Sequence, residues 1–257
     1  MPIQKTDAII LKTQKQGETS KIITLYTRSY GLEKMIAKGS RSTKSRYGGC
    51  LEPLNYLSVI FYRKESRELQ FLSQADIIEP FHAIRNDVEK TAMALVICEI
   101  INRTQLAAEK NPLLFEWIIE VFKGIDNARF ANLNHLLSFQ LKFLDLSGYK
   151  PDLEFCLACR HQPADETIFF DYSRGGFFCQ NCETHTLSGR SLSLNVLKYL
   201  RWLQRNTQAE IAKHKIPTKL INETSNWMSD YLNFHIEGID DLKSLKIFKQ
   251  IVENNVK

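Results

Sequence analysis

Short runs of alternating hydrophobic and polar residues fill the first third of the chain, which is the pattern of β-strands. In LNYLSVIFYR, for example, Leu57, Val59 and Phe61 oppose Ser58 and Ile60. The other runs are TDAIILKTQ, KIITLYT, LEKMIAK and RELQFLSQADII, and turn residues separate them. Five strands within residues 6–79 predict a small barrel or sandwich.

Beyond residue 80 the hydrophobic residues recur with the spacing of helices. The first predicted helix has Asn86 or Asp87 as its cap, because a short polar side chain there accepts from the first free N–H groups. The second has Pro112 in its first turn and ends at Gly124. Helical spacing resumes after a cysteine-rich segment, so the helical region is interrupted by an insert.

Four more helices complete the prediction. One runs from about residue 131 to residue 147, with Gly148 as its stop. The others are SLNVLKYLRWLQR, residues 217 to about 235, and DDLKSLKIFKQIVE with Asp240 as its candidate cap. The predicted domains are therefore a strand domain at 1–80, a helical domain at 81–150 and 190–257, and a cysteine-rich insert at 151–189.

Composition narrows the class of protein. Hydrophobic residues make up 44% of the chain and charged residues 25%, which excludes a disordered or low-complexity protein. The longest apolar run, Ala92–Cys98, is far shorter than the ~18 residues of a membrane span. The N-terminus has Asp7 inside its only apolar stretch and so is not typical of a signal peptide. We expect a soluble, cytosolic, globular protein.

Positive charge is concentrated in the first third. The formal net charge is +5, and Lys and Arg exceed Asp and Glu only within residues 1–80, since the two kinds balance over the rest of the chain. The segment KMIAKGSRSTKSR has no acidic residue, and its second half is rich in Gly, Ser and Thr. It carries Lys34, Lys38, Arg41, Lys44 and Arg46. Like charges on a loop fit a polyanion such as a nucleic-acid backbone, although an ordinary exposed loop is the alternative.

Four of the six cysteines form two Cys-x-x-Cys pairs. Cys156 and Cys159 precede Cys179 and Cys182, and the segment TIFFDYSRGGFF between the pairs is typical of a hairpin that turns at Arg174-Gly175-Gly176. This spacing predicts a structural Zn²⁺ site, because each pair points two thiolates at one tetrahedral centre. Free thiols or a redox pair are the alternatives.

Other candidate ligands are placed outside the predicted zinc site. His161 and His185 lie near the cysteines, but four thiolates already complete a tetrahedron, so we interpret both as surface residues. A closed site of this kind stabilises a fold and leaves no position for a substrate. Cys50 and Cys98 have no partner at ligand spacing and are interpreted as structural.

No catalytic motif is present. The chain lacks the phosphate-binding patterns GxxxxGK[ST] and GxGxxG, and also HExxH and GxSxG. Acidic residues are scattered and the remaining histidines are isolated. The sequence therefore favours a non-enzyme; a metal-dependent nucleic-acid enzyme is the alternative that incubation with labelled DNA and Mg²⁺ or Mn²⁺ would test.

Several stretches together resemble the bacterial RecO recombination-mediator family, over nearly the whole chain. They are GETSKIITLYTRSYGLEKMIAKGSRSTKS, SGYKPDLEFCLAC, GGFFCQNC and DDLKSLKIF. The most specific parts are Gly148–Cys159 and the Lys-Gly-Ser-Arg run at Lys38–Arg41. The resemblance implies an α+β multidomain protein, with an N-terminal OB-fold β-barrel followed by an all-helical domain that carries an inserted four-cysteine zinc module.

The resemblance also implies a function in DNA repair and recombination. Proteins of this family bind single- and double-stranded DNA, anneal complementary strands and work with RecR. They bind the acidic C-terminal tail of single-stranded DNA-binding protein and help load RecA, which places this chain in the bacterial cytoplasm at the nucleoid. An RNA-binding or ribosome-associated protein is the alternative, because phosphate contacts do not distinguish DNA from RNA.

Aromatic residues of the barrel offer faces for base stacking. The candidates are Tyr47, Tyr56, Phe61 and Tyr62, of which those at strand spacing are expected in the core. Tyr47 lies inside the basic loop and is the best stacking candidate. The predicted DNA-binding residues are thus the five loop cations and Tyr47. Whether Arg160, Arg174 and Arg190 near the cysteines also meet DNA stays open.

Overall fold

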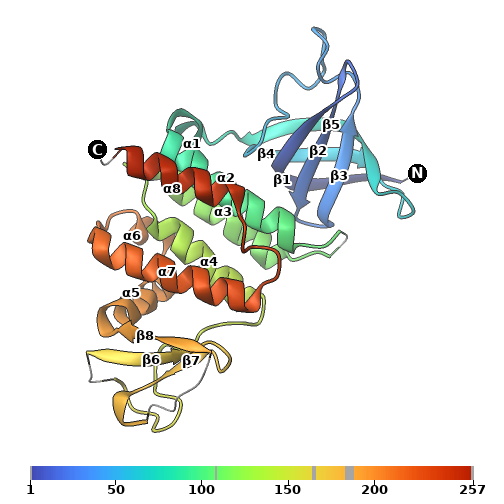
Figure 1. Ribbon diagram of the computed structural model, residues 1–257. Helices are drawn as coiled ribbons and strands as arrows, with labels where there is room; N and C mark the ends of the chain where they lie inside the picture. The colour runs from blue at the N-terminus through green and yellow to red at the C-terminus, as the bar shows by residue number, and fades with distance from the viewer. Residues whose placement is uncertain (1, 108, 164–165, 183–187, 256–257) are drawn as a thin grey trace. The chain divides into compact units, whose positions relative to one another are not determined.

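The five predicted strands are present and close into a barrel (Figure 1). The computed structural model describes residues 2–107, 109–163, 166–182 and 188–255. Around the barrel the strand order is β1-β2-β3-β5-β4, in which β3 and β5 are parallel and the other neighbours antiparallel. The strands are β1 (Ile3–Gln16), β2 (Ser20–Thr27), β3 (Gly31–Ala37), β4 (Tyr56–Tyr62) and β5 (Leu69–Glu79). The predicted barrel architecture is confirmed.

Strand alternation fills the barrel interior. Leu57, Val59 and Phe61 of β4 are completely buried, as are Met35 and Ala37 of β3. The long β3–β4 loop closes the interior as well, because it contributes further buried side chains to the same hydrophobic cluster: Tyr47, Cys50 and Leu51. Lys34, Ile36 and Lys38 alternate with the core residues and face outward, and both lysines are exposed. The barrel therefore sets the direction of its charged side chains.

Four helices belong to the same compact unit as the barrel, which comprises residues 1–127 and 241–257. They are α1 (His82–Asn86), α2 (Val88–Thr104), α3 (Pro112–Asn127) and α8 (Lys243–Asn255). Asp87 caps α2 as predicted, since its side chain accepts from the backbone N–H of Lys90. The predicted end of α3 at Gly124 is wrong, because Gly124 is buried within the helix, which continues to Asn127.

A carboxylate from α2 caps α8, which corrects the prediction that Asp240 would do so. Glu99 accepts hydrogen bonds from the backbone N–H groups of Lys243 and Ser244, from the Ser244 hydroxyl and from Arg103. The backbone N–H groups of a helix start need acceptors, and here the acceptor is distant in sequence. Burial alone raises the pKa of Glu99, but these hydrogen bonds outweigh it and lower the pKa.

The second unit comprises residues 128–240 and combines helices with a small sheet. Its strands have the order β7-β6-β8, and β8, which the sequence pattern does not predict, pairs with the central strand. Phe170 of β6 packs edge-on against Trp227 and Tyr231, and all three rings are buried. The elements are α4 (Asn134–Leu146), β6 (Thr167–Asp171), β7 (Gly176–Phe178), a 3-10 turn (Gln180–Cys182), β8 (Gly189–Ser193), α5 (Leu194–Arg205), α6 (Gln208–Ile211) and α7 (Thr218–His235).

The two units group the helices differently from the three predicted domains. Helices α1–α3 and α8 join the barrel, whereas α4–α7 join the cysteine-rich segment. The predicted domain boundaries remain a prediction. None of the helices in the described part of the chain has the length and apolarity that a membrane span requires.

Candidate metal centre and nucleic-acid interface

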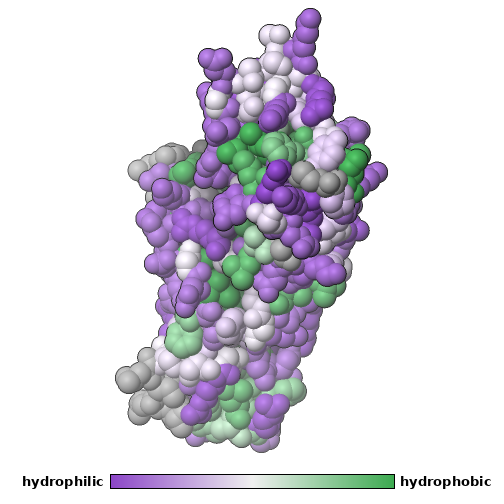
Figure 2. All heavy atoms as spheres, turned by 90° about the vertical axis from the view of Figure 1, so that its right-hand side faces the viewer, coloured by the Kyte–Doolittle hydropathy of each residue, from purple (hydrophilic) through white to green (hydrophobic). Residues whose placement is uncertain are grey.

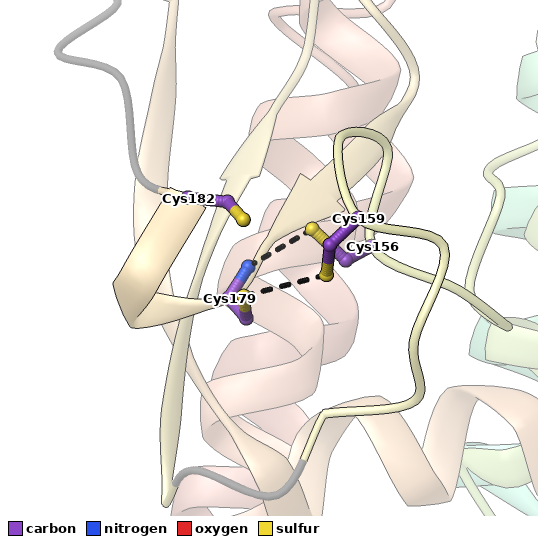
Figure 3. A group of neighbouring side chains, drawn as sticks. All are labelled: Cys156, Cys159, Cys179 and Cys182. Atoms are coloured by element: carbon purple, nitrogen blue, oxygen red, sulfur yellow. Dashed lines mark hydrogen bonds between the residues drawn. The ribbon is translucent and has the colours of Figure 1, made fainter.

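The four predicted cysteines come together in the second unit. Cys156 and Cys159 lie on the loop that follows α4, Cys179 follows β7, and Cys182 ends the 3-10 turn. Their sulfur atoms point into one small space (Figure 3) and all lie within 4.8 Å of one another. The β6–β7 hairpin brings the second pair beside the first, because Phe169 pairs with Phe178, next to Cys179.

The sulfur spacing fits a tetrahedral zinc ion. The Sγ atoms of Cys159 and Cys179 are 3.8 Å apart. Zn–S bonds of ~2.3 Å in a tetrahedron place neighbouring sulfurs ~3.8 Å apart, whereas a disulfide requires a bond of about 2.05 Å. None of the four cysteines forms a disulfide. The cluster is therefore one that could hold a metal ion.

Backbone hydrogen bonds shape the site and favour thiolate. The backbone N–H of Cys179 donates to the Cys156 sulfur, and the N–H of Cys182 donates to the carbonyl of Cys179. Burial raises the pKa of Cys156, but hydrogen bonds from backbone N–H groups outweigh this effect and lower the pKa to about 6. A side-chain hydrogen bond with Cys179 raises the pKa of Cys182, and repulsion between neighbouring thiolates raises it further. A divalent cation would offset that repulsion and allow four thiolates to coexist.

The other predicted non-ligands lie outside this cluster. Among the described residues the cluster contains the four cysteines alone. His161 is exposed, and its backbone carbonyl accepts from the N–H of Cys156. Cys50 and Cys98 are buried elsewhere, in the first unit. His185 lies outside the described residues.

The three arginines near the cysteine pairs are in ion pairs with carboxylates. Arg190 lies 2.6 Å from Asp230, Arg174 lies 3.8 Å from the buried Asp171, and Arg160 lies 3.8 Å from Asp152. Arg160 and Arg174 also lie over the rings of Phe155 and Phe178. The positive charge near the cysteines is thus largely balanced by the fold.

The five predicted loop cations are arranged differently. Lys34, Lys38, Arg41, Lys44 and Arg46 are all exposed. Within the described part of the chain, none of them is in an ion pair with a carboxylate. By contrast, Lys21 of the same barrel lies 2.6 Å from Glu52. The positive charge of the basic loop is therefore not balanced by carboxylates of the described residues.

One of these cations fixes the loop against the rest of the barrel. The Arg41 guanidinium donates to the carbonyls of Gly17 and Glu18, at 3.1 and 3.0 Å, and its backbone N–H donates to Thr19. These three residues form the β1–β2 turn. The β2–β3 face and the β1–β2 loop are where OB-folds bind oligonucleotides, so the basic loop lies beside the usual binding region.

The structure corrects the expectation that Tyr47 stacks on bases. Its side chain is only 3% exposed, in the barrel core, and its hydroxyl donates to the carbonyl of Leu72. Arg46 covers the ring, with its Cζ 5.1 Å from the ring centroid. Tyr56 and Phe61 are also buried, as expected for strand positions, whereas Tyr62 at the end of β4 is 38% exposed. The glycine- and serine-rich sequence of the loop predicts exposure. Tyr47 is buried because the end of the barrel core must be covered by an apolar side chain.

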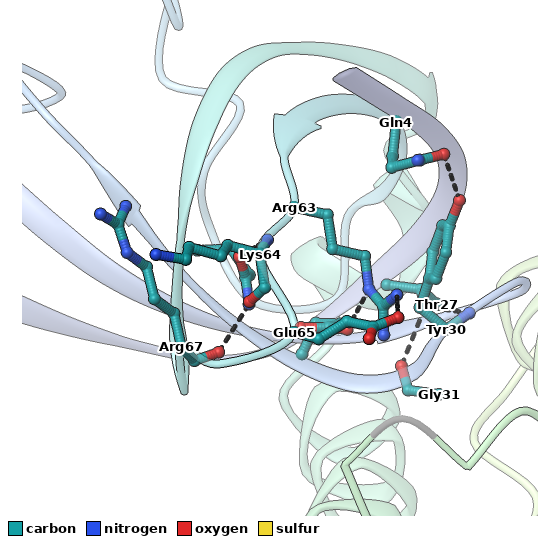
Figure 4. Close-up of polar contacts among 10 residues, drawn as sticks. Gln4, Thr27, Tyr30, Gly31, Arg63, Lys64, Glu65 and Arg67 are labelled. Carbon is teal, nitrogen blue, oxygen red and sulfur yellow. Dashed lines mark hydrogen bonds and ion pairs between the residues drawn. The ribbon is translucent and has the colours of Figure 1, made fainter. Parts of the chain in front are cut away.

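The β4–β5 turn adds cations that sequence reasoning missed (Figure 4). Arg63 already has partners within the barrel, because it forms an ion pair with Glu33 at 3.6 Å and lies over the Tyr30 ring. Lys64 and Arg67 extend to the opposite side from Arg63 in Figure 4. Figure 2 views the barrel from the side of this turn, and hydrophobic side chains gather there among hydrophilic ones. The alternation of residues in β5 could have predicted an outward-facing Phe71, because its neighbour Leu72 points into the core.

Comparisons with known proteins identify the family of this chain. The family model "Recombination protein O N terminal" matches residues 1–81, and "Recombination protein O C terminal" matches residues 85–246. A DNA repair protein RecO of Dehalococcoides mccartyi is 32% identical, over 91% of this chain and 90% of its own length. That of Caldanaerobacter subterraneus is 28% identical over 92% and 94%, and that of Desulforamulus reducens 27% over 100% and 98%.

The chain therefore belongs to the RecO family of DNA repair proteins. This family consists of recombination mediators that are not enzymes. The resemblance inferred from the motifs is confirmed over nearly the full chain.

Proposed function

We propose that this member of the RecO family binds single- and double-stranded DNA through its barrel and anneals complementary strands. The observation that carries the proposal is the set of five exposed cations without carboxylate partners among the described residues, at positions 34–46. Phosphate contacts by Lys and Arg supply most sequence-independent affinity for DNA. Annealing requires only that two polyanions be held together with their bases accessible, so no bond is made or broken.

The proposed partners follow from the family. With RecR, the protein helps load RecA onto DNA that is coated with single-stranded DNA-binding protein. It acts at the bacterial nucleoid, where that DNA lies. The metal in this proposal is a Zn²⁺ ion held by Cys156, Cys159, Cys179 and Cys182. The ion is structural, because four thiolates leave no position for water or substrate.

A groove in the first unit supports binding of an acidic, hydrophobic tail such as that of single-stranded DNA-binding protein. It lies between α2 and α8, with a volume of about 740 Å³, and Leu11, Leu95 and Ile247 are among its apolar lining residues. Lys12 and Lys243 on its rim are exposed and complement acidic side chains. Ile247 is 54% exposed, so Ile247→Glu should abolish binding of the tail peptide and leave DNA binding unchanged.

The decisive test combines DNA binding with strand annealing at low ionic strength. We expect tight, salt-sensitive binding and faster annealing of complementary oligonucleotides. Competition between single-stranded DNA and RNA of equal length separates this function from RNA binding, because the two ligands have the same number of phosphates. A purified protein that fails to bind oligonucleotides at about 50 mM salt, a condition that favours phosphate contacts, would refute the proposal.

A further inference from the structure

The aromatic ring of Phe71 lies among cations on the outer face of the barrel. Phe71 on β5 is only partly buried, and it pairs in register with Ile36 of β3 and with Tyr62 of β4. The Nζ of Lys38 lies over the Phe71 ring, 5.0 Å from its centroid. The Cζ of Arg67 lies over the same ring at 5.5 Å. The β3–β4 loop and the β4–β5 turn therefore each direct one cation to this ring.

The β4–β5 turn is held in place by a buried amide. Gln70 is 3% exposed, and its side chain accepts from the backbone N–H of Lys64 at 2.9 Å. The same side chain donates to the carbonyls of Lys64 and Arg67, at 3.0 and 2.6 Å. Because Gln70 and Phe71 are neighbours, the residue that fixes the turn also fixes the position of Arg67 relative to the ring. The site is preorganised before a ligand arrives.

We infer that Phe71, Lys38 and Arg67 form a stacking site for an unpaired nucleobase. The inference rests on the proposed DNA-binding function and deepens it, since it assigns this face to single strands. Stacking of a base on an aromatic ring contributes more to binding than an exposed cation–π contact does. A base therefore displaces a cation from the ring. The displaced ammonium or guanidinium group then lies beside the phosphate of that nucleotide, where its charge is neutralised.

This arrangement separates single strands from duplexes. The bases of a duplex are already stacked on one another, so they gain nothing from Phe71, and duplex binds through phosphates alone. Each base of a single strand has a free face for the ring, whatever its sequence. The site accordingly prefers unpaired DNA without selecting a sequence. A protein that anneals strands benefits, because this extra affinity for the strand ends when pairing is complete.

The test compares normal and abasic single strands, which carry the same phosphates. We expect the full-length protein to bind a normal strand about tenfold more tightly than an abasic strand of equal length. Phe71→Ala should reduce affinity for the normal strand about tenfold and leave affinity for the abasic strand and for duplex within about twofold. Ile78→Ala is the matched control, because Ile78 is an exposed apolar residue, 46% exposed, on the same strand.

A second variant guards against simple unfolding. Phe71→Trp keeps the ring, so it should retain the preference for the normal strand, and its fluorescence should be quenched by single-stranded DNA and not by the abasic strand. Equal losses for normal, abasic and duplex DNA in Phe71→Ala, or no loss at all, would overturn the inference while salt-sensitive DNA binding still stood. Failure of the unmodified protein to bind any DNA would instead refute the proposed function itself.

Discussion

The basic loop of the barrel and the cysteine module both carry several cations, but the fold treats them differently. Arg160, Arg174 and Arg190 near the cysteines each lie beside a carboxylate of the second unit. The cations at positions 34–46 have no such partner within the described residues. A paired charge contributes to the fold, whereas an unpaired one remains available for a ligand. The number of cations near a site is therefore a weaker guide than the pairing of each one.

Removal of the proposed Zn²⁺ ion should have the largest effect and should separate the two regions. Structural Zn²⁺ contributes about 10–16 kcal/mol of apparent binding energy to small zinc modules. We expect Cys156→Ser, or a strong chelator, to abolish stoichiometric zinc and to unfold the sheet β7-β6-β8. Single-stranded DNA binding by the barrel should persist. Metal analysis and near-ultraviolet circular dichroism measure the first effect, and fluorescence anisotropy with labelled DNA measures the second.

Cys98→Ala is the matched control for the metal prediction. Cys98 is 2% exposed in α2 and is not part of the cluster. The Cys98→Ala variant should keep a zinc content of about one ion per chain, the stoichiometry expected for a site of four thiolate ligands. Loss of DNA binding together with the zinc would break the comparison, because the barrel would then depend on the cysteine module.

Removal of loop charge should have the second largest effect. If the five cations each neutralise one phosphate of a single strand, the logarithmic salt slope is about −3.5, or roughly a hundredfold loss of affinity between 50 and 200 mM salt. The triple variant Lys38→Ala, Arg41→Ala, Lys44→Ala should flatten the slope to about −1.4. It should also weaken binding to all sequences alike. An unchanged slope in anisotropy titrations would place the interface elsewhere.

A pH titration tests Glu99, whose charge stabilises the fold of the first unit and is not available to a ligand. Glu99 caps α8, and its hydrogen bonds outweigh the effect of burial and lower its pKa below the ordinary 4.5. Its stabilising effect is therefore complete above the unfolded-state pKa and is lost as the pH falls through the lower folded-state value. We expect Glu99→Gln to reduce the free energy of unfolding by about 1–2 kcal/mol at pH 7.

Denaturant unfolding at two pH values measures that effect. The difference between Glu99→Gln and the unmodified protein should shrink as the pH falls through the lowered folded-state pKa of Glu99, below which Glu99 is protonated in both states. A difference of the same size at pH 7 and in acid would show that the charge of Glu99 does not hold α8.

The smallest effect is expected from the paired arginines. Changing Arg160, Arg174 and Arg190 together to Ala should alter single-stranded DNA affinity by less than about twofold, since carboxylates already balance their charge. The salt slope should also remain unchanged. A loss comparable to that of the loop variant would bring the cysteine module into the DNA path.

Much of the fold could be predicted from local patterns. Strand alternation predicted the five barrel strands, and helical spacing predicted α2–α5, α7 and α8 to within a few residues. The short elements α1, α6 and β8 were missed, because four or five residues carry little periodicity and β8 depends on its pairing with β6. Gly124 illustrates another limit: burial within α3 tolerates a glycine that would end an exposed helix.

The candidate site residues also differ in how well local sequence patterns predicted them. Cysteine spacing alone identified all four candidate metal ligands, because a Cys-x-x-Cys pair shapes its own local backbone. Sequence reasoning proposed Tyr47 as a stacking residue, but Tyr47 faces the core. No local signal in a loop of Gly and Ser indicates which side chain will close a barrel, and the outward direction of Phe71 depends on the register of three strands.

The sequence by itself determined the order of elements, the basic loop and the two cysteine pairs, because each of these is set by the spacing of residues that are close along the chain. Only the tertiary structure decided which cations lack a carboxylate among the described residues, which aromatic rings are accessible and which carboxylate caps α8. Those properties depend on residues that are distant in sequence, as when Glu99 meets Ser244 or Arg67 meets Lys38 across one ring.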